Sequence, residues 1–172
     1  MEVQRLCTDD ADRLVYYLSQ YHIDQSFVSP LSRRSIPISE RVMNGFRDGA
    51  WYGIADDKIR GCVLRSRYHD GSLYLSTLCW DPEPRARMQV PRLLLMLIAD
   101  HEESKGKPVV IFDSWDGNAT IQRRVHRLGG RILQKFDDPD KRPEGVRSVV
   151  YSIGLEDLKN ACNRLDSTDE SA

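Results

Sequence analysis

Residues 82–97 read PEPRARMQVPRLLLML, and this stretch decides the fold. Its first half is a loop that carries Arg85 and Arg87, and its second half is apolar enough to form a buried helix. A loop that enters a helix at its N-terminus presents free N–H groups and the positive end of the helix dipole, which together favour phosphate. Loops of this kind usually contain glycine, so that the ligand can approach the backbone. Met88 and Val90 stand in those places, so the loop has the position of a phosphate loop without its glycines.

Three strand-like runs precede the loop and are separated by tight polar turns. The runs are AWYGIA (50–55), IRGCVLRSRY (59–68) and SLYLSTLCW (72–80). Asp56-Asp57-Lys58 and His69-Asp70-Gly71 lie between them and have the composition of hairpin turns. Because strands joined by such short turns pair antiparallel, the sequence predicts a three-stranded meander that ends at the arginine-rich loop.

A short strand and two helices are predicted on the N-terminal side of the meander. Residues 3–6 are the strand candidate, and apolar residues at helical spacing predict a helix from about Asp9 to Tyr21. A second helix is predicted over 40–48. The stretch 24–37 between the two helices contains serines, prolines and two arginines, so it is predicted to be an irregular loop.

The apolar helix after the loop opens the C-terminal half of the chain. Because strand, helix and strand in this order need a crossover connection, the strand after the helix is predicted to run parallel to the strand before the loop. The elements predicted in this half are a helix at Arg92–Ser104, a buried strand at Val109–Phe112, a helix at Asn118–Leu128, a strand pair at Arg131–Phe136 and Arg147–Ile153, and a last helix at Leu155–Leu165. The sequence thus predicts a mixed α/β fold with a central, mostly antiparallel mixed sheet flanked by helices. It forms one domain over 1–165, with a disordered tail over 166–172.

The composition argues against several classes of function. The net charge is −1 over 172 residues, which gives no global attraction to nucleic acid or to a membrane surface. The four cysteines form no CxxC or Cys/His pair with metal spacing, and His101 and His126 lie on predicted helices without nearby partners, so no metal site is predicted. No run has the length of a membrane span, and the N-terminus has no signal-like apolar core. The sequence predicts a cytoplasmic protein.

The order of elements resembles that of the GCN5-related N-acetyltransferase (GNAT) superfamily from about Val3 to Ile153. The family's loop motif, Arg/Gln-x-x-Gly-x-Gly/Ala, falls on Arg85–Val90, and an apolar pair follows it as in the family. A second segment, which in the family begins at an asparagine and ends in Tyr-x-x-Leu-Gly-Phe, falls on 118–130. Its asparagine, leucine and first glycine are present, but Val125 replaces the tyrosine and Gly130 the phenylalanine.

The resemblance implies where acetyl-CoA would bind. In working members the loop N–H groups hold the pyrophosphate, and the splayed end of the fourth strand receives the pantetheine arm. Carried onto this chain, the cofactor-binding candidates are Leu78, Trp80, Arg85, Arg87, Met88, Gln89, Val90 and Asn118. The resemblance also requires a carboxylate that deprotonates the amine, for which Asp81 and Glu83 are weak candidates. The tyrosine that protonates the leaving thiolate is missing at Val125.

Two functions from different classes follow. The first is a non-catalytic accessory protein that keeps the fold with a degenerate cofactor site and binds no acetyl-CoA. It resembles the acetyltransferase-like head-assembly proteins of short-tailed bacteriophages, which implies virion proteins as partners and a place in the host cytoplasm or the virion. The alternative is an acetyl-CoA-dependent N-acetyltransferase that acts on a small amine or a protein. The sequence favours the first, because the glycine and tyrosine positions are altered together.

An accessory protein needs an exposed surface for its partner. Two polar, proline-containing segments are predicted to provide it, Asp24–Arg34 and Asp137–Arg147. If both are exposed loops, charge reversal at Lys141 and Arg142 should leave folding nearly unchanged.

Overall fold

The computed structural model describes residues 1–25, 37–138, 142 and 144–169 of the chain, with the backbone only for 21–25 and 168–169. One seven-stranded sheet in the order β1-β2-β3-β4-β5-β7-β6 forms its centre. The strands are β1 Glu2–Arg5, β2 Ala50–Ala55, β3 Ile59–Arg67, β4 Ser72–Trp80, β5 Lys107–Trp115, β6 Arg131–Asp137 and β7 Arg147–Gly154. The helices are α1 Ala11–Gln25, α2 Ile38–Asp48, α3 Pro84–Met88, α4 Val90–Glu103, α5 Ala119–Arg127 and α6 Leu155–Asp169, and a short 3₁₀ helix at Thr8–Asp10 leads into α1.

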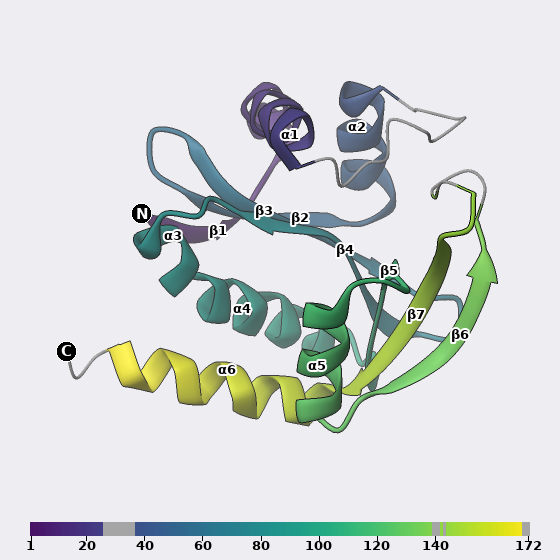
Figure 1. Cartoon of the computed structure of the whole chain (residues 1–172). Helices are drawn as coiled ribbons and strands as arrows, with labels where there is room; N and C mark the ends of the chain where they lie inside the picture. The colour runs from purple at the N-terminus through teal and green to yellow at the C-terminus, as the bar shows by residue number, and fades with distance from the viewer. Residues whose placement is uncertain (26–36, 139–141, 143, 170–172) are drawn as a thin grey trace.

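Helices cover both faces of the sheet. Figure 1 shows α1 and α2 above it and α4, α5 and α6 below it. The lower core packs α4 and α6 against side chains such as Val63, Leu73 and Leu75 of β3 and β4. The upper core packs α1 and α2 against the alternate residues, among them Cys62 and Cys79. Because successive side chains of a strand point to opposite faces, each strand contributes to both cores.

The parallel pairing predicted from the order of elements is confirmed. β4 and β5 run parallel, with Leu73 opposite Val110 and Leu75 opposite Phe112, while the other neighbouring strands are antiparallel. The predicted mixed α/β fold is therefore correct. The crossover from β4 to β5 runs through α3 and α4, so the stretch 82–97 sets the topology.

Four elements differ from the sequence prediction by more than two residues, and one of them is α1, which continues to Gln25, past the predicted end at Tyr21. The arginine-rich loop is itself partly helical, since α3 occupies Pro84–Met88. Proline at the first helical position costs no hydrogen bond, and alanine, arginine and methionine are strong helix formers, which explains why this segment folds locally. β5 extends to Trp115, beyond the predicted Val109–Phe112, and α6 continues to Asp169, past the predicted end at Leu165.

The turn between β3 and β4 is held by Asp70 and supplies a prediction on acid stability. Asp70 Oδ1 accepts the N–H of Ser72 at 2.9 Å, and this bond lowers the pKa of the Asp70 carboxyl from 3.8 to about 2. A lowered pKa stabilises the fold fully above the unfolded value of 3.8, and this contribution is lost as pH falls through about 2. Asp70→Asn keeps an acceptor but does not titrate. We expect the free energy of unfolding in urea to be higher for the natural protein above pH 3.8, and the difference to shrink towards pH 2. A difference that stays constant over this range would contradict the assignment.

Candidate functional site

The two central strands separate at a strained residue. Pairing between β4 and β5 ends at Leu75 and Phe112, although β4 continues to Trp80 and β5 to Trp115. Past this point β4 bulges against β3, because the register shifts between the Cys62–Cys79 and Leu64–Ser76 pairs. Thr77 lies in the bulge with a φ of 53°, a conformation that β-branched residues rarely adopt. Strain of this kind costs on the order of 1–3 kcal/mol and concentrates at functional sites.

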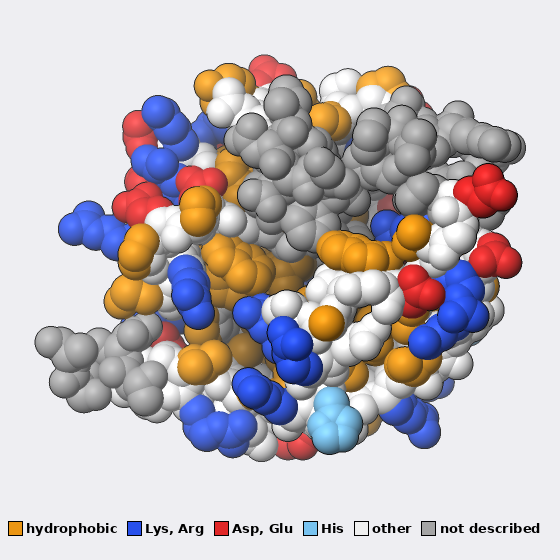
Figure 2. Space-filling view, viewed as in Figure 1, with side chains coloured by type: hydrophobic (Ala, Val, Ile, Leu, Met, Phe, Trp, Pro, Cys, Tyr) orange, Lys and Arg blue, Asp and Glu red, His pale blue; other side chains and the backbone are white. Residues whose placement is uncertain are grey.

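An open, apolar hollow lies on the molecular surface above α4 and beside α5. Figure 2 shows it with a hydrophobic floor and with Lys and Arg side chains along its lower edge. Two of the residues predicted to bind a cofactor lie on the separated part of β4: Leu78, whose side chain is 38% exposed, and the half-buried Trp80. An exposed leucine on a central strand is unusual, and it suits an apolar ligand segment lying between the strands.

The predicted phosphate loop is partly closed by its own hydrogen bonds. The Arg87 N–H donates to the Glu83 carbonyl at 3.1 Å, and the Gln89 N–H donates to the Ala86 carbonyl at 3.1 Å. These main-chain donors are therefore committed to α3 and its end. Met88 is 44% exposed, while Val90 at the start of α4 is half-buried against the lower core. The helical turn and these two side chains together narrow the approach of a phosphate to the backbone.

A pocket of about 610 Å³ lies on the opposite, upper face beside the end of β4. Tyr16 and Tyr17 of α1, Arg60 of β3 and Asp81 line it. The Asp81 carboxylate lies 3.7 Å from the Arg60 guanidinium and is 29% exposed. Burial raises the pKa of Asp81 above its usual value, and the Arg60 charge partly opposes this. Hydrogen bonds from Arg60 and Tyr17 also favour the charged form, but burial outweighs them. Asp81 is thus a carboxylate with a raised pKa next to the separated strand end, a property that suits a general base. The other candidate, Glu83, is exposed at the N-terminus of α3.

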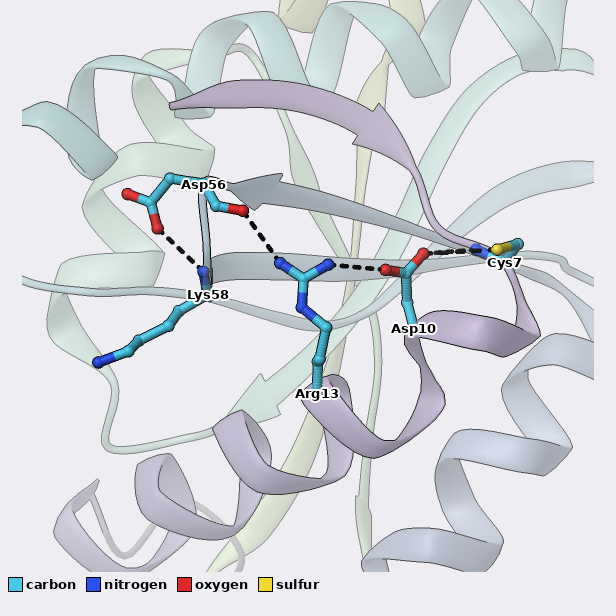
Figure 3. A network of polar contacts seen from close by, with 5 residues as sticks. All are labelled: Cys7, Asp10, Arg13, Asp56 and Lys58. Carbon is cyan, nitrogen blue, oxygen red and sulfur yellow. Dashed lines mark hydrogen bonds and ion pairs between the residues drawn. The ribbon is translucent and has the colours of Figure 1, made fainter.

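One wall of this pocket is held rigid by a polar network around Arg13 of α1 (Figure 3). Arg13 donates to Asp10 Oδ1 at 2.9 Å and to the Asp56 carbonyl in the β2–β3 turn at 3.0 Å. Asp10 also accepts the N–H of Cys7, and Asp56 Oδ1 accepts the N–H of Lys58. The network joins the start of α1 to the β2–β3 turn, two segments that form part of the pocket wall.

Solved acetyltransferases share this architecture. A GNAT-family acetyltransferase from Staphylococcus aureus matches with a TM-score of 0.66 at 16% identity, over 90% of this chain and 98% of that one. The ribosomal-protein-alanine N-acetyltransferase of Brucella melitensis matches with a TM-score of 0.66 at 14% identity, over 90% and 100%. The chain has the GNAT fold. An aminoglycoside 6'-N-acetyltransferase, solved in complex with coenzyme A, matches with a TM-score of 0.64 at 12% identity, over 90% and 97%. No family model and no curated protein matches the sequence.

The remaining cofactor candidates take different places in this GNAT fold. Arg85 and Arg87 are exposed on α3, where they can meet an anion. Asn118 caps α5, because its Oδ1 accepts the N–H of Ile121 at 3.2 Å while its Nδ2 donates to Ser114 Oγ at 3.0 Å. Val125, at the GNAT tyrosine position, is buried against β7 and cannot donate a proton. α5 also carries three exposed arginines, at positions 123, 124 and 127.

A polar cluster that sequence reasoning did not assign lies where β4 and β5 part. The Tyr74 hydroxyl of β4 donates to Asp113 of β5, whose other oxygen accepts from Arg142 at 3.2 Å. Burial, followed by the Asp113 charge, raises the pKa of Tyr74. The Arg142 side chain is only 13% exposed, so the prediction that it belongs to an exposed partner surface is wrong. Asp113 interrupts an otherwise apolar strand, VVIFD, and that interruption was the available signal.

Other residues singled out in the sequence have structural places. His101 is fully buried, and its Nε2 lies 2.9 Å from the Lys107 carbonyl. Across the described ranges, no group of three or more His, Cys, Asp and Glu side chains is placed to hold a metal ion. In the same ranges no helix is long and apolar enough to cross a membrane. Most of Asp24–Arg34, the other predicted partner surface, lies outside the described residues.

Proposed function

We propose that this protein is an acetyl-CoA-dependent N-acetyltransferase with a weakened phosphate site. The observation that carries the proposal is the separation of β4 from β5 at the strained Thr77 bulge, beside the exposed Leu78. Keeping a β-branched residue in the left-handed region is costly, so the surrounding structure must hold it there. A non-catalytic descendant has no need to keep that strain. The solved structures compared above are acetyltransferases that share this fold, which also favours this function.

The residues present fit the two ends of acetyl-CoA unequally. Leu78 and Trp80 on the separated end of β4 suit the apolar part of the pantetheine arm. Arg85 and Arg87 suit the phosphates, since guanidinium groups form charge-assisted hydrogen bonds with them. The main-chain donors of α3 contribute less, because those of Arg87 and Gln89 are already bonded. When bound, acetyl-CoA supplies an acetyl group as a thioester.

The acceptor amine enters, in this proposal, from the face that carries Asp81. An alkyl ammonium group must lose a proton before it attacks, and a carboxylate in contact with it or joined to it by water can accept that proton. Burial raises the pKa of Asp81, which makes this carboxylate a better base than an exposed one. Val125 offers no proton to the leaving thiolate. A free thiol has a pKa of about 8.5, so solvent can supply this proton near neutral pH.

Acetyl-CoA binding is expected to be weak and to improve when glycine is restored to the loop. Isothermal titration should give a Kd above ~10 μM for the natural protein, because α3 uses two main-chain donors and Met88 and Val90 crowd the loop. The double change Met88→Gly and Val90→Gly frees the backbone approach and disfavours the α3 helix, since glycine costs a helix about 1 kcal/mol. It should tighten binding at least ~10-fold, which corresponds to about 1.4 kcal/mol.

Met43→Gly is the matched control, because Met43 is a 49% exposed methionine on the distant helix α2. It should leave the Kd unchanged. Acetyl transfer is followed in parallel as thiol release with a panel of primary amines. If the natural protein binds no acetyl-CoA, releases no thiol with any amine, and the glycine variant behaves the same, the transferase assignment fails.

A non-catalytic accessory role is the second candidate, and the hydrogen bonds within α3 favour it. They occupy part of the cradle on which acetyl-CoA binding depends, and Val125 removes the acid as well. The narrower role, head assembly in a short-tailed bacteriophage with virion proteins as partners, remains a prediction, as does a cytoplasmic or virion location. The titration separates the two candidates, because an accessory protein of this kind should gain little from restored glycines without the rest of the site.

A further inference from the structure

A second pocket lies at the opposite end of the sheet from the separated strands. It has a volume of about 310 Å³ and is formed where β1 and β3 end, β2 begins and α4 ends. Its lining includes Arg5, Arg47, Arg65 and Arg67. Arg67 pairs with Leu73 at the start of β4, whereas the strand separation lies towards Trp80. At about 3.3 Å per residue the two sites are roughly 20 Å apart, so this arginine pocket is distinct from the acetyl-CoA site.

The arginine pocket carries more positive charge than its carboxylates neutralise. Asp48 accepts two hydrogen bonds from Arg47, at 2.9 and 3.0 Å. Asp100, behind the pocket, lies 3.9 Å from Arg5 and already accepts the Tyr52 hydroxyl. Four guanidinium groups therefore face the paired carboxylates Asp48 and Asp100, and Glu40 also acts on Arg47, which leaves a formal surplus of one positive charge. Like charges held this close repel, so an anion between them would be favoured.

Neutral acceptors hold two of the arginines in place. Arg65 donates to the Asp100 carbonyl at 3.3 Å and to Ser104 Oγ at 3.0 Å, and Arg67 donates to the Ser104 carbonyl at 2.8 Å. These acceptors orient the guanidinium groups without cancelling their charge. Among the described residues the buried Arg65 Nε has no hydrogen-bond partner. Charged donors that are fixed and incompletely paired are suited to bind an anion.

Capping of α4 explains only part of this arrangement. The carbonyls at a helix C-terminus attract cations, which accounts for Arg65 and Arg67. It does not account for Arg5 and Arg47, which come from β1 and α2, pair with Asp100 and Asp48, and remain 64% and 70% exposed at the rim. Two oriented arginines at the base and two at the rim form a receptor that can surround a ligand.

We propose that the arginine pocket binds a small phosphate-bearing ligand, at a site separate from the acetyl-CoA cleft. Guanidinium forks match the geometry of phosphate oxygens, and several such groups are needed for a ligand with more than one phosphate charge. The volume is at the lower end of ligand pockets, which suits a diphosphate group rather than a whole coenzyme. The proposal does not depend on acetyl transfer.

Inorganic pyrophosphate is the probe, titrated calorimetrically into the full chain at low salt. The natural protein should bind it, and Arg5→Gln with Arg67→Gln should weaken binding at least ~10-fold, or by about 1.4 kcal/mol. Arg131→Gln with Lys135→Gln removes the same charge from the exposed strand β6 and is the matched control. Arg85→Gln with Arg87→Gln tests the acetyl-CoA site. Both controls should lower the affinity less than 3-fold.

Folding of each variant is checked by thermal unfolding, because Arg67 also caps α4. If the double variant does not fold, Arg5→Gln alone, at a rim position, should still weaken binding measurably. Absence of binding to the natural protein overturns the proposal, as does an equal loss in the Arg131 and Lys135 control. Loss confined to the Arg85 and Arg87 variant assigns the ligand to the acetyl-CoA site. If the protein binds duplex DNA but not pyrophosphate, and Arg5→Gln weakens that binding, the proposal of a small ligand is overturned and the pocket is assigned to nucleic acid.

Discussion

Replacing Asp113 by asparagine is expected to lower the free energy of unfolding by about 3 kcal/mol. The change removes the negative charge that faces Arg142, whose side chain is only 13% exposed, and leaves this guanidinium without the carboxylate it pairs with at 3.2 Å. Loss of one partner of a buried ion pair typically costs about 3–5 kcal/mol, and the remaining exposure of this pair places it at the lower end. Tyr74 also loses a charged acceptor for its hydroxyl. Urea unfolding at neutral pH measures the effect.

Asp116→Asn is the matched control for this change. Asp116 follows β5 and pairs with Arg147 at 3.2 Å, but the Arg147 side chain is 50% exposed. Surface pairs contribute about 0–1 kcal/mol, so this variant should be nearly as stable as the natural protein. Equal and small effects for Asp113 and Asp116 would mean that the Tyr74–Asp113–Arg142 cluster does not fix the point at which β4 and β5 separate.

The topology was predictable because it depends on local signals. Short polar turns such as His69-Asp70-Gly71 force antiparallel neighbours, and the apolar helix after the loop forces a crossover. The GNAT resemblance implied that these strands separate, but not that they do so after Leu75 and Phe112. Hydrophobic periodicity is read from neighbouring residues, so it needs no knowledge of distant contacts.

The site was predicted less completely, because its geometry depends on contacts between distant residues. Tyr74 and Asp113 are 39 positions apart, and Arg142 reaches Asp113 from a loop 29 positions further on. Periodicity carries no information on such pairs. The strained conformation of Thr77 is equally invisible, since threonine is an ordinary strand residue. The α3 helix was missed for a different reason: the GNAT resemblance implied a loop there, whereas the local propensity of Pro84–Met88 favours a helix.

These features bear on each other at the separated strands. The strands β4 and β5 separate beside the strained Thr77 bulge, as an acetyl-CoA site requires. The loop predicted to bind the phosphates, in contrast, is partly closed by the hydrogen bonds of α3 and by its side chains. A transferase can tolerate this combination, because tight ground-state binding of a cosubstrate lowers KM without raising kcat. An accessory protein gains nothing from the strain at Thr77. A catalytic group beside the separated strands would therefore decide between a transferase and an accessory protein, and Asp81 is the residue to test.

Asp81→Asn is expected to lower kcat/KM for acetyl transfer by about 100-fold or more, while the Kd for acetyl-CoA stays within a factor of 3. Asparagine keeps the size of the side chain and its acceptor oxygen but cannot take a proton from the amine. Burial raises the pKa of Asp81, so for the natural protein kcat/KM should fall as pH decreases through a value above 3.8, when the base becomes protonated. The variant should lose this acidic limb. Both quantities come from thiol release measured over a pH series.

Asp57→Asn is the control, because Asp57 is an exposed carboxylate that lines the same pocket. If the pocket only attracts a cationic amine by charge, the two variants should raise KM alike and leave kcat and the pH profile unchanged. If Asp81 is the base, kcat falls only in its own variant, and the acidic limb disappears with it. A large loss of kcat in both variants would instead indicate that the pocket wall, held by Arg13 and Asp56, has moved. If only the Asp81 variant loses kcat, a catalytic carboxylate at the end of β4 explains why this chain combines strained, separated strands with a weakened phosphate site, because its rate depends on the transfer step more than on cofactor affinity.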